Sequence, residues 1–107
     1  MTRPLGLMRH VAEVYKGTQP RKDYTAENEA PDLQMRMRVS IRPLSGRELA
    51  TAREVYPLVT HLITGRWNQT IKPDMWLDVR GRVFQVVSVT NIDELNHTAN
   101  ILAIETA

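Results

Sequence analysis

Residues 34–42 alternate apolar and polar side chains, and this pattern constrains the fold more than any other segment of the chain. Successive side chains of a strand point to opposite faces, so one set faces a core and the other faces outward. The inward set is Met35, Met37, Val39 and Ile41, and the outward set includes Arg36, Arg38 and Arg42. Like charges along one face of a strand repel each other. The arginine row is therefore either a solvated face or a charged surface that meets a partner subunit or a channel.

A strand-to-helix corner follows at residues 42–48. Pro43 has no N–H for a sheet ladder, so we expect the strand to end at Arg42. Ser45 and Glu48 have the spacing of a capping box, in which each side chain accepts a hydrogen bond from the backbone near the other. The sequence therefore predicts a short capped helix over residues 46–56.

Five further segments have strand patterns, and compact turn signals separate several of them. They are residues 9–16, 58–67, 75–79, 82–89 and 98–105. Arg80 and Gly81 predict a tight hairpin between the third and fourth of these segments. The fold class that follows is mainly β: a small barrel or sandwich of about six strands, with one inserted helix and a long loop after the first strand. We expect residues 1–107 to form a single domain.

Residues 17–33 have no periodicity, and a stretch of that length inside a small domain is usually functional or disordered. Residues 21–32 carry two basic and four acidic side chains, a local charge of −2. A segment with this charge repels DNA phosphate more than it attracts it.

Composition excludes several classes of protein. The chain has no cysteine, so neither a disulfide framework nor thiolate chemistry is expected, which fits synthesis in a cytosol. No apolar run is long enough to span a bilayer. The net charge of +2 is small, and the arginines are interleaved with carboxylates, whereas phosphate-tracking proteins concentrate their charge in a patch.

The residues also give no support for catalysis or for a cofactor. His10, His61 and His97 are far apart in the chain and lack metal-ligand spacing. No nucleophile elbow, glycine-rich phosphate loop or calcium loop is present. Trp67 and Trp76 lie in or beside strands and are more typical of core or interface anchors than of base-stacking platforms. We therefore expect no enzyme activity, no metal and no cofactor.

Several segments in the same order resemble one known family. They are residues 42–48 (Arg-Pro-Leu-Ser-Gly-Arg-Glu), 59–61 (Val-Thr-His), 71–75 (Ile-Lys-Pro-Asp-Met), 79–86 (Val-Arg-Gly-Arg-Val-Phe-Gln-Val) and 89–94 (Val-Thr-Asn-Ile-Asp-Glu). In order and spacing, the chain resembles the phage head–tail joining proteins of long-tailed phages, also called head-closure, stopper or head–tail adaptor proteins. The resemblance covers roughly residues 36–105. Residues 35–37 and 64–67 depart from the family pattern.

The resemblance implies a structural connector in the virion neck, made in the host bacterial cytoplasm. Such a protein forms a ring, hexameric or dodecameric, between the portal with its adaptor and the tail. It closes the DNA channel after packaging and gives the tail a docking surface. The implied partners are further copies of the chain, the portal-associated adaptor, the tail terminator or tail tube protein, and genomic DNA without sequence-specific binding. No membrane partner is implied.

The resemblance also suggests candidate functional residues. The channel or gate loop comprises Gly17, Pro20, Arg21, Lys22, Asp23, Tyr24, Glu27, Glu29, Pro31 and Asp32. The candidate subunit or partner interface comprises Arg36, Arg38, Arg42, Arg47, Glu48, Arg53, Trp67 and Trp76. The alternative function is a small nucleic-acid-binding barrel that uses Arg36, Arg38, Arg42, Arg80 and Arg82.

Overall fold

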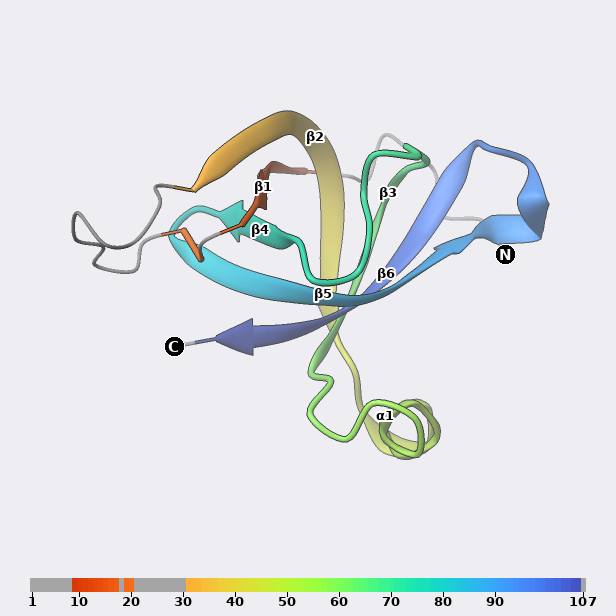
Figure 1. The fold of residues 1–107 in the computed structure, drawn as a ribbon. Helices are drawn as coiled ribbons and strands as arrows, with labels where there is room; N and C mark the ends of the chain where they lie inside the picture. The colour runs from red at the N-terminus through yellow and green to blue at the C-terminus, as the bar shows by residue number, and fades with distance from the viewer. Residues whose placement is uncertain (1–8, 18, 21–30, 107) are drawn as a thin grey trace.

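The long strand β2 (Asp32–Pro43) organises the fold, because its first part pairs with one neighbour and its last part with another. The structure is a computed structural model that describes residues 9–17, 19–20 and 31–106. In it, β2 pairs with β1 (His10–Lys16) up to Val39, and with β3 (His61–Arg66) from Val39 onward. Figure 1 shows β2 as an arch over the top of the molecule.

The described strands close into a barrel in the order β1-β2-β3-β6-β5-β4, with every pair antiparallel (Figure 1). The remaining strands are β4 (Trp76–Val79), β5 (Arg82–Asn91) and β6 (Thr98–Thr106). The helix α1 (Gly46–Arg53) lies between β2 and β3, and the short 3₁₀ helix η2 (Ile92–Glu94) lies between β5 and β6. The register shifts at Val14/Tyr15 and at Val86/Ser88, and such irregularities help a sheet to bend and close. The predicted mainly β class, with a barrel of six strands and one inserted helix, is confirmed.

The apolar alternation of β2 predicted its inner face correctly. Met37 and Val39 are buried, and Met35 and Ile41 pack partly buried against the same core. Every strand contributes to this core. Its fully buried large side chains include Val14, Val39, Ile63, Leu77, Phe84, Val86 and Ile101. Burial of one such side chain contributes roughly 1.5–3 kcal/mol, so the filled barrel interior supplies most of the stabilisation.

The hairpin predicted at Arg80 and Gly81 joins β4 to β5. Both residues have left-handed backbone angles, with φ of 52° and 87°. The Gly81 N–H donates to the Asp78 side chain at 3.1 Å and helps to hold the turn. Two left-handed residues match the twist of the flanking strands, which is why a glycine occurs here.

The strand-to-helix corner differs from its prediction in two ways. Ser45 is the N-cap residue, but its side chain makes no capping hydrogen bond. The Glu48 carboxylate instead accepts two hydrogen bonds from the guanidinium of Arg42, the second of them, from Nη2 to Oε2, at 3.1 Å. A charge-assisted, two-pronged contact is stronger than a neutral cap, so the capping-box prediction is wrong. In addition, β2 extends one residue further, through Pro43.

The helix is also shorter than predicted. It ends at Arg53 rather than at residue 56, because the N–H groups of Glu54 and Val55 bond to carbonyls three residues back and tighten the last turn. Figure 1 shows α1 standing away from the barrel, attached through the chain between β2 and β3. None of its side chains is fully buried. Leu49, Ala52 and Tyr56, which would share one face of a helix over residues 46–56, are only half-buried.

The boundaries of the predicted loop at residues 17–33 also change. Asp32 and Leu33 belong to β2, where they pair with Lys16 and Tyr15 of β1. Sequence periodicity missed this pairing because β2 continues past its alternating part. The segment after Gly17 therefore leaves and re-enters the barrel at neighbouring strand ends.

Candidate functional site

The outward arginines of β2 lie on the surface as predicted, but they have different surroundings. Arg36 donates through Nε to Glu13 Oε2 on β1 at 3.2 Å. Arg42 forms its ion pair with Glu48 of α1, and this contact raises the pKa of Arg42 and lowers that of Glu48. Arg38, between them, has no carboxylate within ion-pair distance among residues 9–17, 19–20 and 31–106. The repulsion expected along the row is thus relieved at both ends and remains at its centre.

A surface hollow lies where β3 leaves β2. Because β3 pairs with β2 only from Val39 onward, the preceding residues of β2 have β1 on one side and no paired strand of the described chain on the other. The hollow has a volume of about 310 Å³. Its lining comprises Met35, Arg36, Met37, Arg38, Arg66, Trp67 and Asn68. We call it the arginine hollow, since an apolar floor of Met35, Met37 and Trp67 is accompanied by three arginines.

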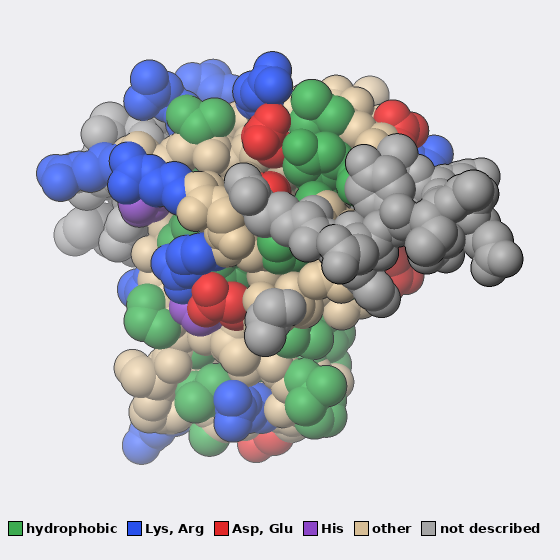
Figure 2. Space-filling model, turned by 90° about the vertical axis from the view of Figure 1, so that its left-hand side faces the viewer, with side chains coloured by type: hydrophobic (Ala, Val, Ile, Leu, Met, Phe, Trp, Pro, Cys, Tyr) green, Lys and Arg blue, Asp and Glu red, His purple; other side chains and the backbone are tan. Residues whose placement is uncertain are grey.

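Arg66, Trp67 and Asn68 form the side of the arginine hollow opposite β2, and backbone hydrogen bonds hold this side in place. Arg66 is the last residue of β3, and the Trp67 N–H donates to the His97 carbonyl just before β6 at 3.0 Å. Like Arg38, Arg66 has no carboxylate within ion-pair distance in the described part of the chain. Figure 2 shows Lys and Arg side chains gathered along the top of one face, at the height of the β2 arch. Two uncompensated guanidinium groups beside an apolar floor favour an anionic partner that also carries an apolar group.

The turn between β5 and β6, residues 91–96, presents the opposite chemistry. Asp93, Glu94 and Leu95 are all exposed, and Leu95 retains 71% of its accessible surface. Asp93, Glu94 and Asn96 have left-handed φ angles of 54°, 56° and 56°. Such angles are unfavourable for residues with a Cβ. We call residues 91–96 the acidic turn.

Two hydrogen bonds hold the acidic turn in this conformation. Asn91 donates through Nδ2 to Asn96 Oδ1 at 2.7 Å, and the Asn96 N–H donates to Asn91 Oδ1 at 3.0 Å. The Leu95 N–H also donates to the Ile92 carbonyl at 3.2 Å. The exposed leucine is therefore presented by a turn that its own side chains tie together.

A third polar group lies at the end of β3, β5 and β6. Arg82 donates through Nε and Nη2 to Glu105 at 2.8 and 3.1 Å. His61 Nε2 lies 3.8 Å from Glu105 Oε1, and the His61 ring meets Phe84 edge to face, with centroids 5.2 Å apart. Burial lowers the pKa of His61, against the opposing effect of Glu105, and hydrogen bonds from Arg82 lower the pKa of Glu105. These contacts join strand ends and make the group structural.

The described residues hold no group of three or more His, Asp or Glu that could bind a metal ion. Within the described ranges, no helix is long and apolar enough to cross a membrane. What the site offers is surface: a basic hollow and an acidic turn.

The structure brings together some of the sequence-predicted interface residues and separates others. Arg36, Arg38 and Trp67 share the arginine hollow. Arg42 and Glu48 form the ion pair at the corner, and Arg47 is exposed on α1. Arg53 donates to the Val59 carbonyl at 3.2 Å, and the Trp76 indole donates to the Gly17 carbonyl at 3.0 Å.

Few of the candidate gate residues can be placed. Gly17 is exposed with φ of 86°, Pro20 is buried, Pro31 is half-buried and Asp32 begins β2. The other candidates, Arg21, Lys22, Asp23, Tyr24, Glu27 and Glu29, lie outside the described residues. The gate therefore stays a prediction from the sequence.

Sequence reasoning missed Arg66 and the acidic turn. Arg66 lies near the end of the strand pattern over residues 58–67, and that pattern does not distinguish it from any other exposed strand residue. In the acidic turn, the signal available was a large apolar residue, Leu95, that directly follows two acidic residues of a turn. Such a leucine has no strand or helix face to join, which indicates exposure.

Known proteins indicate to which family this small barrel with its charged surfaces belongs. No curated protein matches the chain. A family model described as phage head completion protein matches residues 3–106, which is nearly the whole chain. The described barrel falls within the match, as do the arginine hollow and the acidic turn. The chain belongs to the phage head completion protein family.

Proposed function

We propose that this head completion protein forms a ring in the neck of the phage particle, between the portal with its adaptor and the tail. In this position it closes the DNA channel after packaging and provides the surface on which the tail docks. The observation that carries the proposal is the family match over residues 3–106. Members of this family are structural proteins that complete the phage head, so the proposed role is one within the virion.

The structure supports a role that depends on surfaces. Apolar side chains from every strand fill the barrel interior. The charged and apolar groups available to partners lie on the outside, in the arginine hollow, the acidic turn and α1. We propose further copies of the chain, the adaptor, and the tail terminator or tail tube protein as partners of these surfaces. Genomic DNA passes through the ring, and the protein does not bind it in a sequence-specific way.

We also propose that the segment within residues 17–33 closes the channel. Its charge of −2 over residues 21–32 supports a gate that repels phosphate rather than a site that binds it. The pairing of Lys16 with Asp32 brings the two ends of the segment together on neighbouring strands. A segment anchored in this way can be shortened without separating the strands of the barrel.

Two particle experiments test the proposal. Particles assembled without this protein should lose packaged DNA and fail to join tails, as measured by nuclease protection and electron microscopy. Particles that carry a chain with residues 21–30 replaced by a short Gly-Ser linker should contain the protein but leak DNA. Particles that lack the protein yet retain DNA and join tails normally would show that the proposed function is wrong.

The alternative of a nucleic-acid-binding barrel receives little support from the geometry. Of its five candidate arginines, Arg36, Arg42 and Arg82 are each paired with a carboxylate. Phosphate binding would have to break these pairs or rely on the remaining two. Fluorescence anisotropy with duplex DNA at low salt should therefore detect no binding. Binding whose affinity falls steeply as salt is added would instead support the alternative.

A further inference from the structure

We propose that neighbouring copies of this chain join by placing the acidic turn of one copy in the arginine hollow of the next. Leu95 enters the hollow, and Asp93 and Glu94 lie against Arg38 and Arg66 of the neighbour. The inference rests on the proposed ring, and it names the surfaces by which the ring would be joined.

The acidic turn has the properties of an inserting group. Leu95 is 71% exposed, which leaves a large apolar side chain in water beside two exposed carboxylates. The two Asn91–Asn96 hydrogen bonds fix the turn before any contact is made. A surface that is already ordered loses little entropy when it binds, and this favours association.

The arginine hollow has the properties of a receiving site for such a group. A cavity of roughly 150 Å³ holds benzene, so a hollow of about 310 Å³ has room for a leucine side chain. Its floor includes Met35 and Met37, whose flexible side chains adapt to an incoming group. Trp67 is of a type that often dominates binding energy at interfaces.

Charge complementarity selects the occupant. Arg38 and Arg66 have no carboxylate partner among the described residues, and each can bind a carboxylate through two parallel N–H groups. The acidic turn supplies two carboxylates, and beside them Leu95, which would pack on the apolar floor of the arginine hollow. DNA could supply the negative charge, but it has no aliphatic side chain for the apolar floor. A second copy of this chain supplies both.

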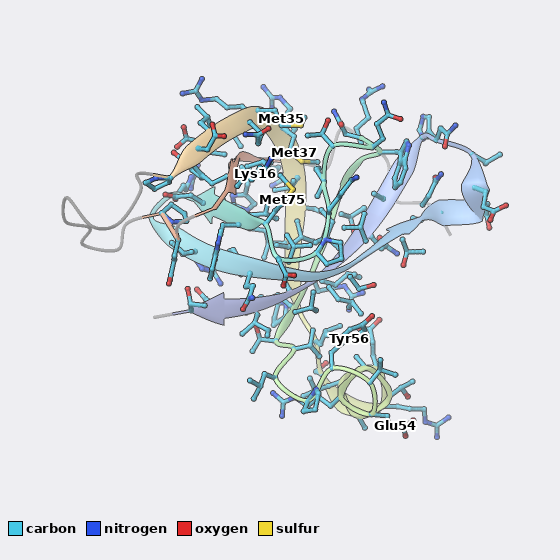
Figure 3. All side chains as sticks on the ribbon, viewed as in Figure 1. Lys16, Met35, Met37, Glu54, Tyr56 and Met75 are labelled. Atoms are coloured by element: carbon cyan, nitrogen blue, oxygen red, sulfur yellow. The ribbon has the colours of Figure 1, made fainter. Side chains whose placement is uncertain are left out.

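The two surfaces differ, so the contact runs head to tail. Figure 3 shows Met35 and Met37 on the β2 arch and the turn between β5 and β6 protruding at one side of the barrel, beyond the start of β6 that pairs with Arg66. A head-to-tail contact leaves one free turn and one free hollow on every pair. Further copies then add until the rotation between them closes a ring.

Disulfide trapping tests the contact, because the chain has no cysteine of its own. Full-length Leu95→Cys protein is mixed under mild oxidation with Asn68→Cys protein, in which the thiol lies in the lining of the hollow. The matched control replaces Asn68→Cys with Thr51→Cys, an exposed position on α1. We expect the mixed disulfide at residues 95 and 68 to form at least tenfold faster than the control. Equal rates would overturn the proposal.

Charge reversal provides a second test that separates contact from misfolding. One variant carries Arg38→Glu and Arg66→Glu, and the other carries Asp93→Arg and Glu94→Arg. Each is combined with Leu95→Cys in one preparation and Asn68→Cys in another. Each charge variant should fail to cross-link with itself, and mixing the two should restore cross-linking, because both turns then meet hollows of opposite charge. Failure of mixing to restore it, with both variants folded by circular dichroism, would overturn the contact.

The two proposals fail in distinguishable ways. If particles without the protein lose DNA but both charge-reversal variants complete heads normally, the neck function stands and this contact is wrong. If Leu95→Cys cross-links in particles to a different virion protein and not to a second copy, the contact is also wrong. If particles without the protein retain DNA while the cross-link still forms, the neck function is wrong and the contact stands.

Discussion

A single methyl group added at Gly65 tests how closely β2 and β3 pack beside the arginine hollow. A Cβ built on Gly65 would lie 2.5 Å from Met37 Cε, and 3.3 Å from both Arg38 O and Val39 Cγ1. Carbon atoms in favourable contact are about 3.5–4.0 Å apart. The end of the Met37 side chain must therefore move by roughly 1–1.5 Å. We predict that Gly65→Ala destabilises the protein.

Two effects of opposite sign decide the size of this change. Replacing glycine with alanine in a compatible conformation stabilises by about 0.4–1 kcal/mol, because the unfolded chain loses freedom. Overpacking a filled site costs about 1–3 kcal/mol. The end of Met37 has to move by roughly 1–1.5 Å inside a filled core, whereas the two contacts at 3.3 Å need shifts of only a few tenths of an ångström. The net expectation is a loss of about 1 kcal/mol in the free energy of unfolding.

The assay is a double-mutant cycle measured by urea unfolding. Met37→Val removes the clashing methyl group and should itself cost about 1–2 kcal/mol. In the double variant Gly65→Ala should cost almost nothing, which gives a coupling energy of about 1 kcal/mol. Effects that add within about 0.5 kcal/mol, or a Gly65→Ala protein more stable than wild type, would refute the packing argument.

Three further predictions concern other parts of the molecule. The folded-state pKa values of His61 and Glu105 are both lowered, so at acidic pH the unfolded chain binds more protons than the folded protein. The free energy of unfolding should therefore decrease as the pH is lowered, below about pH 6.5 because of His61 and further below about pH 4.5 because of Glu105. His61→Gln should flatten the decline between about pH 7 and pH 5 in urea unfolding, and an unchanged slope would contradict this. Leu49→Asp should cost only about 1–2 kcal/mol, because Leu49 is half-buried, and a loss above about 3 kcal/mol would show a buried helix face. Glu94→Gly should raise the free energy of unfolding by up to about 1 kcal/mol by relieving a left-handed residue, while it weakens cross-linking through the acidic turn; lower stability would contradict the strain.

The strands could be predicted from the sequence because their burial is one-sided. In β2 the alternation from Met35 to Ile41 reports the inner face directly, and the turn at Arg80 and Gly81 reports backbone angles that few residue pairs adopt. The start of β2 at Asp32 could not be predicted, because Asp32 pairs with Lys16 at an exposed position, and exposed pairs produce no apolar alternation in the sequence. Closure of the barrel likewise depends on pairing between β1 and β4, which are far apart in the chain.

The corner shows why a local motif can fail. Ser45 and Glu48 satisfy the spacing of a capping box, yet Glu48 has a stronger donor in Arg42, which the strand places beside it. The motif describes only neighbours within one helix, whereas the competing partner comes from β2. For the same reason the sequence predicted Arg36, Arg38 and Trp67 as interface residues without showing that they share a hollow, because the contact between β2 and the end of β3 is tertiary.

The strain in the acidic turn connects its backbone with its proposed use. A turn between β5 and β6 can be closed by glycine without cost at left-handed positions, yet Asp93, Glu94 and Asn96 occupy them here. Asn96 compensates for its angle by bonding to Asn91, but the carboxylates of Asp93 and Glu94 are exposed and make no ion pair within the described chain. Folding alone gains nothing from these two acids or from an exposed Leu95. A second surface that binds them would offset this cost, and among the described residues the arginine hollow has the matching charge and apolar lining.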